Sequence, residues 1–283
     1  ANGQLGLCLF DQLMHSQHDV EYLNKNDLDI CIESQLRTHI KKLKPEIIIN
    51  CAAYTQVDKS EDESKLANLV NNISVKNLAE ISKEFNIKLI HISTDYVFDG
   101  TKNTPYTEKD VCNPINKYGE TKYLGEQQII KSECHYLIIR TSWVFSEYKT
   151  NFVKTMLELG EKNKILNIID DQLGSPTYAG DIAKFIRHVI ESDYIDNSII
   201  NFSGDKAITW YGFAKKIFEV AKDYSLKTPI ELIPARTEDF DFNAKRPKLS
   251  VLSSQLLKKK YKINPSNWQQ GLHKVIKIYK KNK

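Results

Sequence analysis

The chain has 283 residues, of which 41% are hydrophobic and 27% are charged, and its formal net charge is +4. This length and apolar content allow a large core, in one big domain or two unequal ones, whereas so small a net charge gives no reason to expect a nucleic-acid partner. No apolar run reaches the ~18 residues of a membrane span and no signal peptide is visible, so we expect no membrane partner and a cytoplasmic protein.

Cysteine and histidine usage favours neither a disulfide framework nor a metal centre. The five cysteines are odd in number and include no Cys-x-x-Cys pair. The seven histidines show no metal-ligand spacing, and lone ones such as His91 most often serve as hydrogen-bonded polar residues. The sequence therefore predicts no metal site.

The first six residues, Ala-Asn-Gly-Gln-Leu-Gly, are typical of the end of a glycine-rich turn that opens a helix. Glycines in such a turn let the backbone approach a diphosphate, and the helix N-terminus offers unbonded N–H groups and the positive end of its dipole. Gly3, Gln4, Leu5 and Gly6 are therefore predicted to bind a dinucleotide. The apolar strand and first glycine that precede this turn elsewhere are not in the sequence, and we expect them to be missing from this chain.

From Leu5 onward, short apolar runs alternate with helix-length segments. The expected strands are 19–23, 46–50, 88–92 and 136–140, and the expected helices are 32–42, 61–85 and 118–132. This alternation is typical of right-handed βαβ units. It predicts an α/β fold, a Rossmann-like doubly wound parallel sheet with helices on both faces.

The end of the second expected strand is where such a sheet selects its cofactor. Lys25 favours a 2′-phosphate and hence NADPH, but Asp27 and Asp29 are near enough to bind the ribose hydroxyls of NADH. The sequence leaves both cofactors open.

Small, hydroxyl and aromatic side chains follow the later strands. Ala52 and Ala53 leave room for a flat ring or a ribose, although small residues fit tight helix–sheet packing equally well. Trp143 follows the strand at 136–140, where an indole can wall a sugar pocket or belong to the core.

The most informative motif is Tyr118 with Lys122, which follows Ser93-Thr94-Asp95 by about two dozen residues. Residues four apart on a helix share a face, so we expect the ammonium to lie beside the phenol and favour its ionised form. The residues after Ile92 lie at the carboxyl end of a buried strand, where open α/β sheets bind their ligands. The sequence therefore predicts that a hydroxyl pair and a Tyr/Lys pair meet at one crevice.

After Trp143 the alternation becomes less regular. Helices are expected at 151–162, 178–192 and 209–224, strands at 164–169 and 198–203, a turn-rich loop at 171–177, and largely loop at 229–247. We expect residues 1–147 to form the dinucleotide-binding domain, with returning segments near 164–203. Residues 148–163 and 204–283 are expected to form mainly a smaller α/β substrate-binding lobe.

Together these motifs resemble the extended short-chain dehydrogenases/reductases and, among them, the dTDP-4-dehydrorhamnose reductase family. The similarity extends over nearly the whole chain, and it is carried by residues 3–6, 50–58, 93–98, 116–122, 140–143, 171–177 and 245–247. Tyr-x-x-x-Lys alone marks the superfamily. The runs Ser-Thr-Asp-Tyr-Val-Phe and Arg-Thr-Ser-Trp are far more specific.

The resemblance implies reduction of the 4-keto group of a dTDP-sugar, dTDP-4-dehydro-β-L-rhamnose, by NADPH or NADH. It implies that Tyr118 donates the proton, that Lys122 tunes the phenol and holds the nicotinamide ribose, and that Thr94 hydrogen-bonds the carbonyl. The implied cofactor-binding residues are Gly3, Gln4, Leu5, Gly6, Lys25, Asp29, Ile30, Ala52, Ala53, Tyr54, Tyr118 and Lys122. The implied substrate-binding residues are Thr55, Val57, Ser93, Thr94, Asp95, Tyr96, Tyr118, Trp143 and Arg246.

The same resemblance leaves alternatives. In the sugar-nucleotide dehydratases that this chain resembles, the corresponding run is Thr-Asp-Glu, whereas this chain has Tyr96 after Asp95. This difference disfavours a dehydratase, whereas an epimerase or another sugar-nucleotide reductase stays open. The non-catalytic β subunit of methionine adenosyltransferase also resembles these reductases. Some members dimerise through magnesium held by an acidic residue of the first helix, but Cys8 in that helix is no hard-cation ligand. We expect a monomer or a homodimer without metal.

Overall fold

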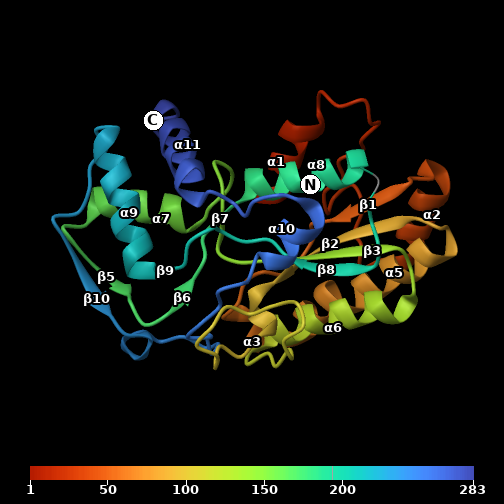
Figure 1. The fold of residues 1–283 in the computed structure, drawn as a ribbon, viewed down its shortest axis with the longest axis horizontal. Helices are drawn as coiled ribbons and strands as arrows, with labels where there is room; N and C mark the ends of the chain where they lie inside the picture. The colour runs from red at the N-terminus through yellow and green to blue at the C-terminus, as the bar shows by residue number, and fades with distance from the viewer. Residues whose placement is uncertain (193) are drawn as a thin grey trace.

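A computed structural model describes residues 1–192 and 194–283 of the chain. Its centre is a parallel sheet with the strand order β1-β2-β3-β8 (Figure 1). The strands are β1 (Ile47–Asn50), β2 (Lys88–Thr94), β3 (Tyr136–Thr141) and β8 (Ser198–Asn201). The α/β fold class and the parallel sheet are thereby confirmed.

The strands β2 and β3 lie in the middle of the sheet, and each contains a run of buried apolar residues. Leu89, Ile90, Leu137, Ile138 and Ile139 are fully buried. A strand with helices on both faces needs such a continuous apolar run rather than an alternating one. The expected strands at 46–50, 88–92 and 136–140 therefore coincide with β1, β2 and β3.

Helices cover both faces of this sheet, as Figure 1 shows. One face is covered by α1 (Gln4–Leu13) and α8 (Ala179–Ser192), which pack against each other and share one apolar cluster with the sheet. The other face is covered by α5 (Ser74–Glu84) and α6 (Lys117–Ser132), which also pack together. The helix α2 (Glu33–Leu43) packs against α5.

The helix expected at 61–85 is interrupted. It consists of α3 (Lys59–Asp62), α4 (Ser64–Asn68), a π-helical turn η1 (Leu69–Ile73) and α5. Asn71 in the π-helical turn is fully buried, and its amide donates to Thr121 of α6 at 3.1 Å and to the carbonyl oxygen of Tyr54 at 3.1 Å. The turn therefore ties the segment after β1 to α6.

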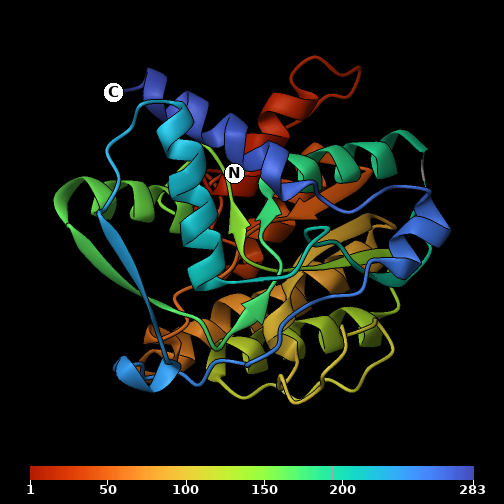
Figure 2. The same cartoon turned by 60° about the vertical axis from the view of Figure 1, so that its left-hand side comes forward.

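The C-terminal half forms a second group of elements, which Figure 2 brings forward. Its helices are α7 (Phe152–Lys162), α9 (Trp210–Asp223) and α11 (Trp268–Lys281), whereas α10 (Gln255–Tyr261) packs against β8 of the central sheet. The strands are β4 (Val144–Phe145), β5 (Ile165–Ile169), β6 (Leu173–Gly174), β7 (Thr177–Tyr178), β9 (Ile208–Thr209) and β10 (Glu231–Ala235). The short helical turn η3 (Thr237–Asp239) also belongs here, whereas η2 (Asp95–Val97) directly follows β2.

This half has its own apolar core, to which α7, α9 and α11 contribute Leu157, Phe213 and Leu272. The strand β8 returns to the central sheet beside β3, whereas β5 pairs in parallel with β10. These pairings are compatible with the expected split into a dinucleotide-binding domain and a smaller lobe, which stays a prediction.

One expectation about secondary structure is wrong. Residues 19–23 are not a strand: a strand requires a hydrogen-bonded neighbour, and this segment has no ladder in the described structure. Its backbone accepts a hydrogen bond at Leu23 from the amino group of Ala1. Residues 229–247 are largely loop, as expected, but they also contain β10, which pairs with β5.

None of the helices in the described parts of the chain combines the length and the hydropathy that a membrane span requires.

The fully buried Ile138 allows a test of the central sheet. Replacing Ile138 by Ala should lower the free energy of unfolding by about 3 kcal/mol, and by Val about 1 kcal/mol, because each deleted methyl leaves a cavity in the cluster between the sheet and α5/α6. Urea unfolding measures both values. The control Val111→Ala, at a side chain that is 86% exposed, should stay within ~0.5 kcal/mol. Equal losses of unfolding free energy in Ile138→Ala and Val111→Ala would contradict this packing.

Candidate active site

The candidate site lies where β2 ends and α6 begins. Asn116 caps α6 by accepting a hydrogen bond from the N–H of Gly119 at 2.8 Å. A Cβ atom at Gly119 would lie 2.1 Å from the carbonyl oxygen of Tyr96, so the first turn of α6 touches the backbone just after β2. This close approach brings Tyr118 next to Thr94 and Tyr96.

The phenol of Tyr118 lies against two predicted partners. Its ring packs edge-on against that of Tyr96, with centroids 5.5 Å apart, and its hydroxyl lies near enough to the Thr94 side chain for Thr94 to act on its pKa. Burial raises the pKa of Tyr118 to about 12, while Thr94 opposes this rise. The expected shift toward the ionised form is therefore wrong, because desolvation outweighs the effect of Thr94, and the charge of Asp95 raises the pKa further.

Lys122 shares a helix face with Tyr118 but is almost fully buried, with 2% of its surface exposed. Its Nζ donates to the carbonyl oxygen of Ile92 at 2.6 Å and lies 3.2 Å from Nε2 of His91. Burial lowers the pKa of Lys122 to about 8, against the attraction of Glu126. The ammonium group is thus anchored to the end of β2 rather than to the phenol.

Asp95 is a buried carboxyl at the same strand end. Its Oδ1 accepts a hydrogen bond of 3.0 Å from the hydroxyl of Thr94, whose oxygen also accepts from the N–H of Tyr96 at 3.2 Å. Burial raises the pKa of Asp95 to about 7, while the hydroxyls of Ser250 and Thr94 oppose the rise. The carboxyl therefore changes its charge near neutral pH.

Beneath these residues lies a buried ion pair. Glu126 accepts hydrogen bonds from Arg140 at 2.9 and 2.6 Å, and its Oε1 also accepts one of 2.5 Å from Ser93. Glu126 follows Lys122 by four residues on α6, while Ser93 and Arg140 come from β2 and β3. The pair thus fixes α6 against the sheet, and the hydroxyl of Ser93 is used there.

Trp143 leaves β3 in a strained conformation. Its φ angle is +46°, in the left-handed region that side-chain-bearing residues seldom adopt. The indole stacks on Trp210 with centroids 3.5 Å apart, and it covers Gly174, where a Cβ would lie 2.3 Å from the ring. The ring of Trp210 is in turn held by a 3.2 Å hydrogen bond to Gln172. The surroundings therefore fix the orientation of Trp143.

The start of α1 fits a bound dinucleotide. Gly3 is the N-cap residue of this ten-residue helix, and no side chain caps the helix there. A Cβ atom at Gly3 would meet no atom within 4 Å, so open space adjoins the free N–H groups of the helix end. These are the features that a diphosphate requires.

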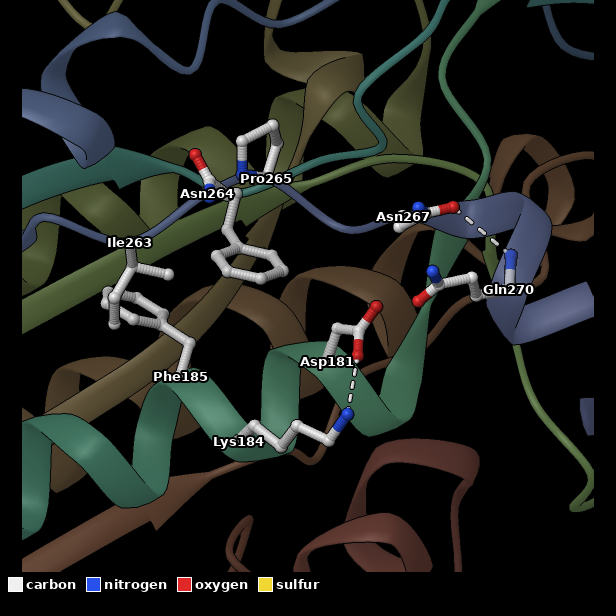
Figure 3. A pocket seen from close by; sticks show the side chains of 9 residues that line it. Asp181, Lys184, Phe185, Ile263, Asn264, Pro265, Asn267 and Gln270 are labelled. Atoms are coloured by element: carbon white, nitrogen blue, oxygen red, sulfur yellow. Dashed lines mark hydrogen bonds and ion pairs between the residues drawn. The ribbon is translucent and has the colours of Figure 1, made fainter.

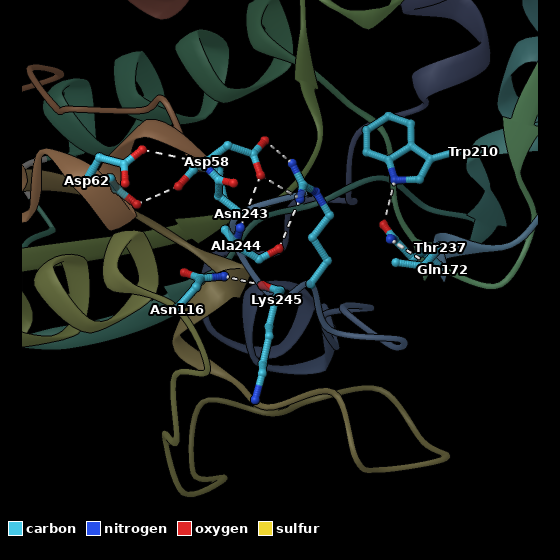
Figure 4. A network of polar contacts seen from close by, with 12 residues as sticks. Asp58, Asp62, Asn116, Gln172, Trp210, Thr237, Asn243, Ala244 and Lys245 are labelled. Carbon is cyan, nitrogen blue, oxygen red and sulfur yellow. Dashed lines mark hydrogen bonds and ion pairs between the residues drawn. The ribbon is translucent and has the colours of Figure 1, made fainter. Parts of the chain in front are cut away.

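Arg246 is held by Asp58 across the two halves of the chain. Its guanidinium donates to both carboxylate oxygens at 3.0 and 2.5 Å, which lowers the pKa of Asp58. Figure 4 shows Asp58 beside Asn243 and Ala244, and the N–H of Ala244 donates to the same carboxylate at 3.2 Å. The substrate-binding role expected for Arg246 therefore competes with an existing ion pair.

Comparison with known proteins identifies the family. The family model described as the RmlD substrate binding domain matches residues 1–281. The chain belongs to this RmlD family. It is 39% identical to a dTDP-4-dehydrorhamnose reductase of Aggregatibacter actinomycetemcomitans, over 99% of this chain and 97% of that relative. It is 36% identical to the spore coat polysaccharide biosynthesis protein SpsK of Bacillus subtilis, over 98% of this chain and 94% of that protein.

A solved structure of an RmlD relative is similar over nearly the same length. The crystal structure of the dTDP-4-dehydrorhamnose reductase of Bacillus anthracis, in complex with NADP, matches with a TM-score of 0.91 and 38% identity. The match covers 97% of this chain and 95% of that one. The resemblance inferred from the motifs is thereby confirmed.

In this RmlD family member the remaining predicted residues lie around the same strand ends. Gln4 accepts hydrogen bonds from Ser146 and Asn151, both at 3.0 Å, so its side chain secures α1 rather than facing a ligand. Leu5 is in the core, and Ile30 packs with α2. Tyr54 donates to Glu63 at 2.8 Å.

The other predicted residues are more exposed. Lys25 has 77% of its side chain exposed and lies 4.0 Å from Asp29 in a weak surface ion pair. Ala52 and Thr55 are exposed, and Ala53 and Val57 are half-buried. The segment after β1 thus leaves backbone and small side chains accessible beside α6.

A pocket of about 250 Å³ lies elsewhere, between α8 and the segment before α11 (Figure 3). Asp181 and Lys184, which line it, pair with each other at 3.1 Å, and Asn267 caps α11. None of the predicted site residues lines this pocket. Within the described ranges, no cluster of three or more His, Cys, Asp or Glu side chains has the geometry of a metal site.

Sequence reasoning missed the polar residues behind Lys122. Asn50 and His91 face each other across β1 and β2 and are both buried. Glu126 was also missed, although its spacing from Tyr118 and Lys122 on one helix face could have indicated it. The sequence signal is a Glu on the same helix face as the predicted Tyr and Lys.

The raised pKa of Asp95 predicts a pH dependence of stability. The native state binds the Asp95 proton more tightly than the unfolded chain, so its contribution to the free energy of unfolding falls as pH rises from about 4 to about 7. Asp95→Asn removes this titration. Between pH 5 and pH 8, the free energy of unfolding measured with urea should therefore fall by at least about 1 kcal/mol more in the wild type than in the variant. Parallel pH profiles would contradict the assignment.

Proposed function

We propose that the protein is an oxidoreductase that reduces the 4-keto group of dTDP-4-dehydro-β-L-rhamnose with NADPH or NADH, giving dTDP-L-rhamnose. The names of two near-full-length relatives support this reaction. The single observation that carries it is the position of Tyr118, on the same helix as Lys122, beside Thr94 and Tyr96 at the end of β2. A protein that only binds nucleotides has no need of such a phenol.

When bound, the nicotinamide cofactor supplies the hydride. Tyr118 supplies the proton: with a pKa of about 12 its phenol is protonated at neutral pH, which suits a donor to an oxygen that becomes an alkoxide. Because an alkoxide is a far stronger base than a phenolate, the transfer is downhill even from such a weak acid. Positioning of the phenol then matters more than its acidity.

Thr94 must exchange a partner when the substrate binds. Its hydroxyl has one proton and two lone pairs. In the structure its proton is donated to Asp95, and its oxygen accepts from the N–H of Tyr96. A substrate carbonyl only accepts, so to receive a proton from Thr94 it would have to take the place of Asp95, while Tyr118 would supply the second hydroxyl.

Residues around the first turn and after β1 would hold the cofactor. Open space beside Gly3 would admit the diphosphate, and Ala52, Ala53 and Tyr54 would line the nucleotide. Lys122 would hold the nicotinamide ribose. The NADP complex of the Bacillus anthracis relative and the exposed Lys25 favour NADPH, while Asp29 keeps NADH as an alternative.

The sugar nucleotide would lie between the sheet and the smaller lobe. Thr55, Val57, Asp95 and Tyr96 would contact it from the sheet side, and Trp143 would wall the sugar. Arg246 would bind the diphosphate, since a guanidinium matches phosphate oxygens in two-point contact. Ser93 is less suited, because its hydroxyl already donates to Glu126.

The role of Tyr118 is testable by removing its hydroxyl. Tyr118→Phe should reduce turnover ~10²-fold or more with little change in NADPH affinity, because the proton is lost while the ring remains. NADPH oxidation is followed with dTDP-4-dehydro-β-L-rhamnose made in place by the preceding enzymes. Tyr123→Phe, on the same helix, is the matched control and should retain turnover. Unchanged activity in Tyr118→Phe would remove this residue from the mechanism.

The role of Arg246 is separable from its ion pair. Arg246→Met should raise the KM for the sugar nucleotide ~10-fold or more, because a charge-assisted contact to the diphosphate is lost. Asp58→Asn breaks the same ion pair but keeps the guanidinium, so its KM should stay near that of wild type or fall. Equal KM values in both variants would leave Arg246 a structural residue.

A further inference from the structure

A chain of buried polar groups lies behind the candidate site. The N–H of Ala52 donates to Oδ1 of Asn50 at 3.1 Å, and Nδ2 of Asn50 lies 3.1 Å from Nδ1 of His91. Nε2 of His91 lies 3.2 Å from Nζ of Lys122, which also donates to the carbonyl oxygen of Ile92. Asn50, His91 and Lys122 are at most 5% exposed. Water therefore has little part in these contacts.

The backbone N–H at one end fixes the direction of every hydrogen bond in the chain. This N–H is a donor, so the amide atom of Asn50 that meets it is the oxygen, and the NH₂ group faces His91. Nδ1 of His91 therefore accepts. Burial keeps the pKa of His91 well below its usual value, so the ring is neutral and carries its proton on Nε2.

The proton on Nε2 points at Lys122. An ammonium group has only donors, so this contact is a hydrogen bond only when Nζ is a neutral amine that accepts from His91 and donates to Ile92. Burial favours the same state, since it lowers the pKa of Lys122 to about 8. The charged or titratable groups that act on Lys122 besides His91 are Glu126, already bound by Arg140, and Cys51.

The charged state of Lys122 needs the opposite arrangement. Nε2 of His91 must then accept, its proton must be on Nδ1, and the amide of Asn50 must turn so that Oδ1 receives that proton. The N–H of Ala52 would then face the NH₂ group and lose its partner. In this network, a charged Lys122 and a hydrogen bond from the Ala52 N–H to Asn50 therefore exclude each other.

We propose that His91 is a positioning residue that, through Asn50, couples the charge of Lys122 to occupancy of the cofactor segment at Ala52. The coupling rests on the proposed function, in which Ala52 lines the cofactor. A cofactor oxygen that accepts the Ala52 N–H would release Asn50 to turn. Nζ of Lys122 then gains the Nε2 proton of His91 while Nδ1 gains one from the buffer, so that cofactor binding takes up a proton.

The tautomer of His91 is the first test, and it needs no ligand. In protein labelled with ¹⁵N-histidine, long-range ¹H–¹⁵N spectra at pH 9 should show the proton of His91 on Nε2, with the signal assigned from His91→Gln. A proton on Nδ1 would overturn the proposal. Because this measurement is made without cofactor or sugar, its result is independent of the proposed reaction.

Calorimetry of NADH binding is the second test, since NADH has no 2′-phosphate to titrate. At pH 8, in Tris and in phosphate, the buffer dependence of the enthalpy should show uptake of about half a proton per site, because about half of Lys122 is then neutral. His91→Gln keeps a polar group next to Lys122 but not the link to Asn50, and Lys122→Met removes the titrating group. Uptake should fall in both.

The exposed His188 supplies the control, since His188→Gln should leave proton uptake as in wild type. Full uptake in His91→Gln, or none in wild type, would overturn the coupling. Loss of the proposed function looks different: NADH binding and proton uptake would persist while no dTDP-sugar is reduced.

Discussion

The contact between the buried amine of Lys122 and the end of β2 is the constraint on which the rest of the site depends. A lysine that is 2% exposed must satisfy its Nζ within the protein, and here Ile92 and His91 do so. This fixes the rotation of α6 about its axis. Tyr118 one turn earlier and Glu126 one turn later are then placed by helix geometry, the first beside Thr94 and the second on Arg140.

Desolvation governs the chemistry of this arrangement. It raises the pKa values of Tyr118 and Asp95 and lowers those of Lys122 and His91, which in each case favours the uncharged form. A site with little charge of its own responds strongly to charge that arrives with a ligand, because the same low dielectric strengthens each new interaction. The phosphates of a cofactor are such a charge.

The sequence predicted those parts of the fold that local pattern decides. The apolar runs of β2 and β3 and the helix at 117–132 follow from period and length, and the shared face of Tyr118 and Lys122 follows from their spacing. Pairing between distant segments does not follow from pattern, which is why β10 was missed. The pKa of Tyr118 also depends on burial by the whole fold, and the Asn50–His91 contact depends on the register of β1 on β2.

Chemistry and recognition are divided between two kinds of support. Thr94, Tyr118 and Lys122 stand on a sheet and a helix whose positions are set by many buried contacts, so small changes elsewhere hardly move them. Trp143 and Arg246 stand on connecting segments, each held by a few specific contacts: a stacked indole and an ion pair with Asp58. Since loops tolerate substitution better than a core, the proposed roles imply that the choice of sugar nucleotide can change through these segments while Tyr118, the proposed proton donor, stays where it is.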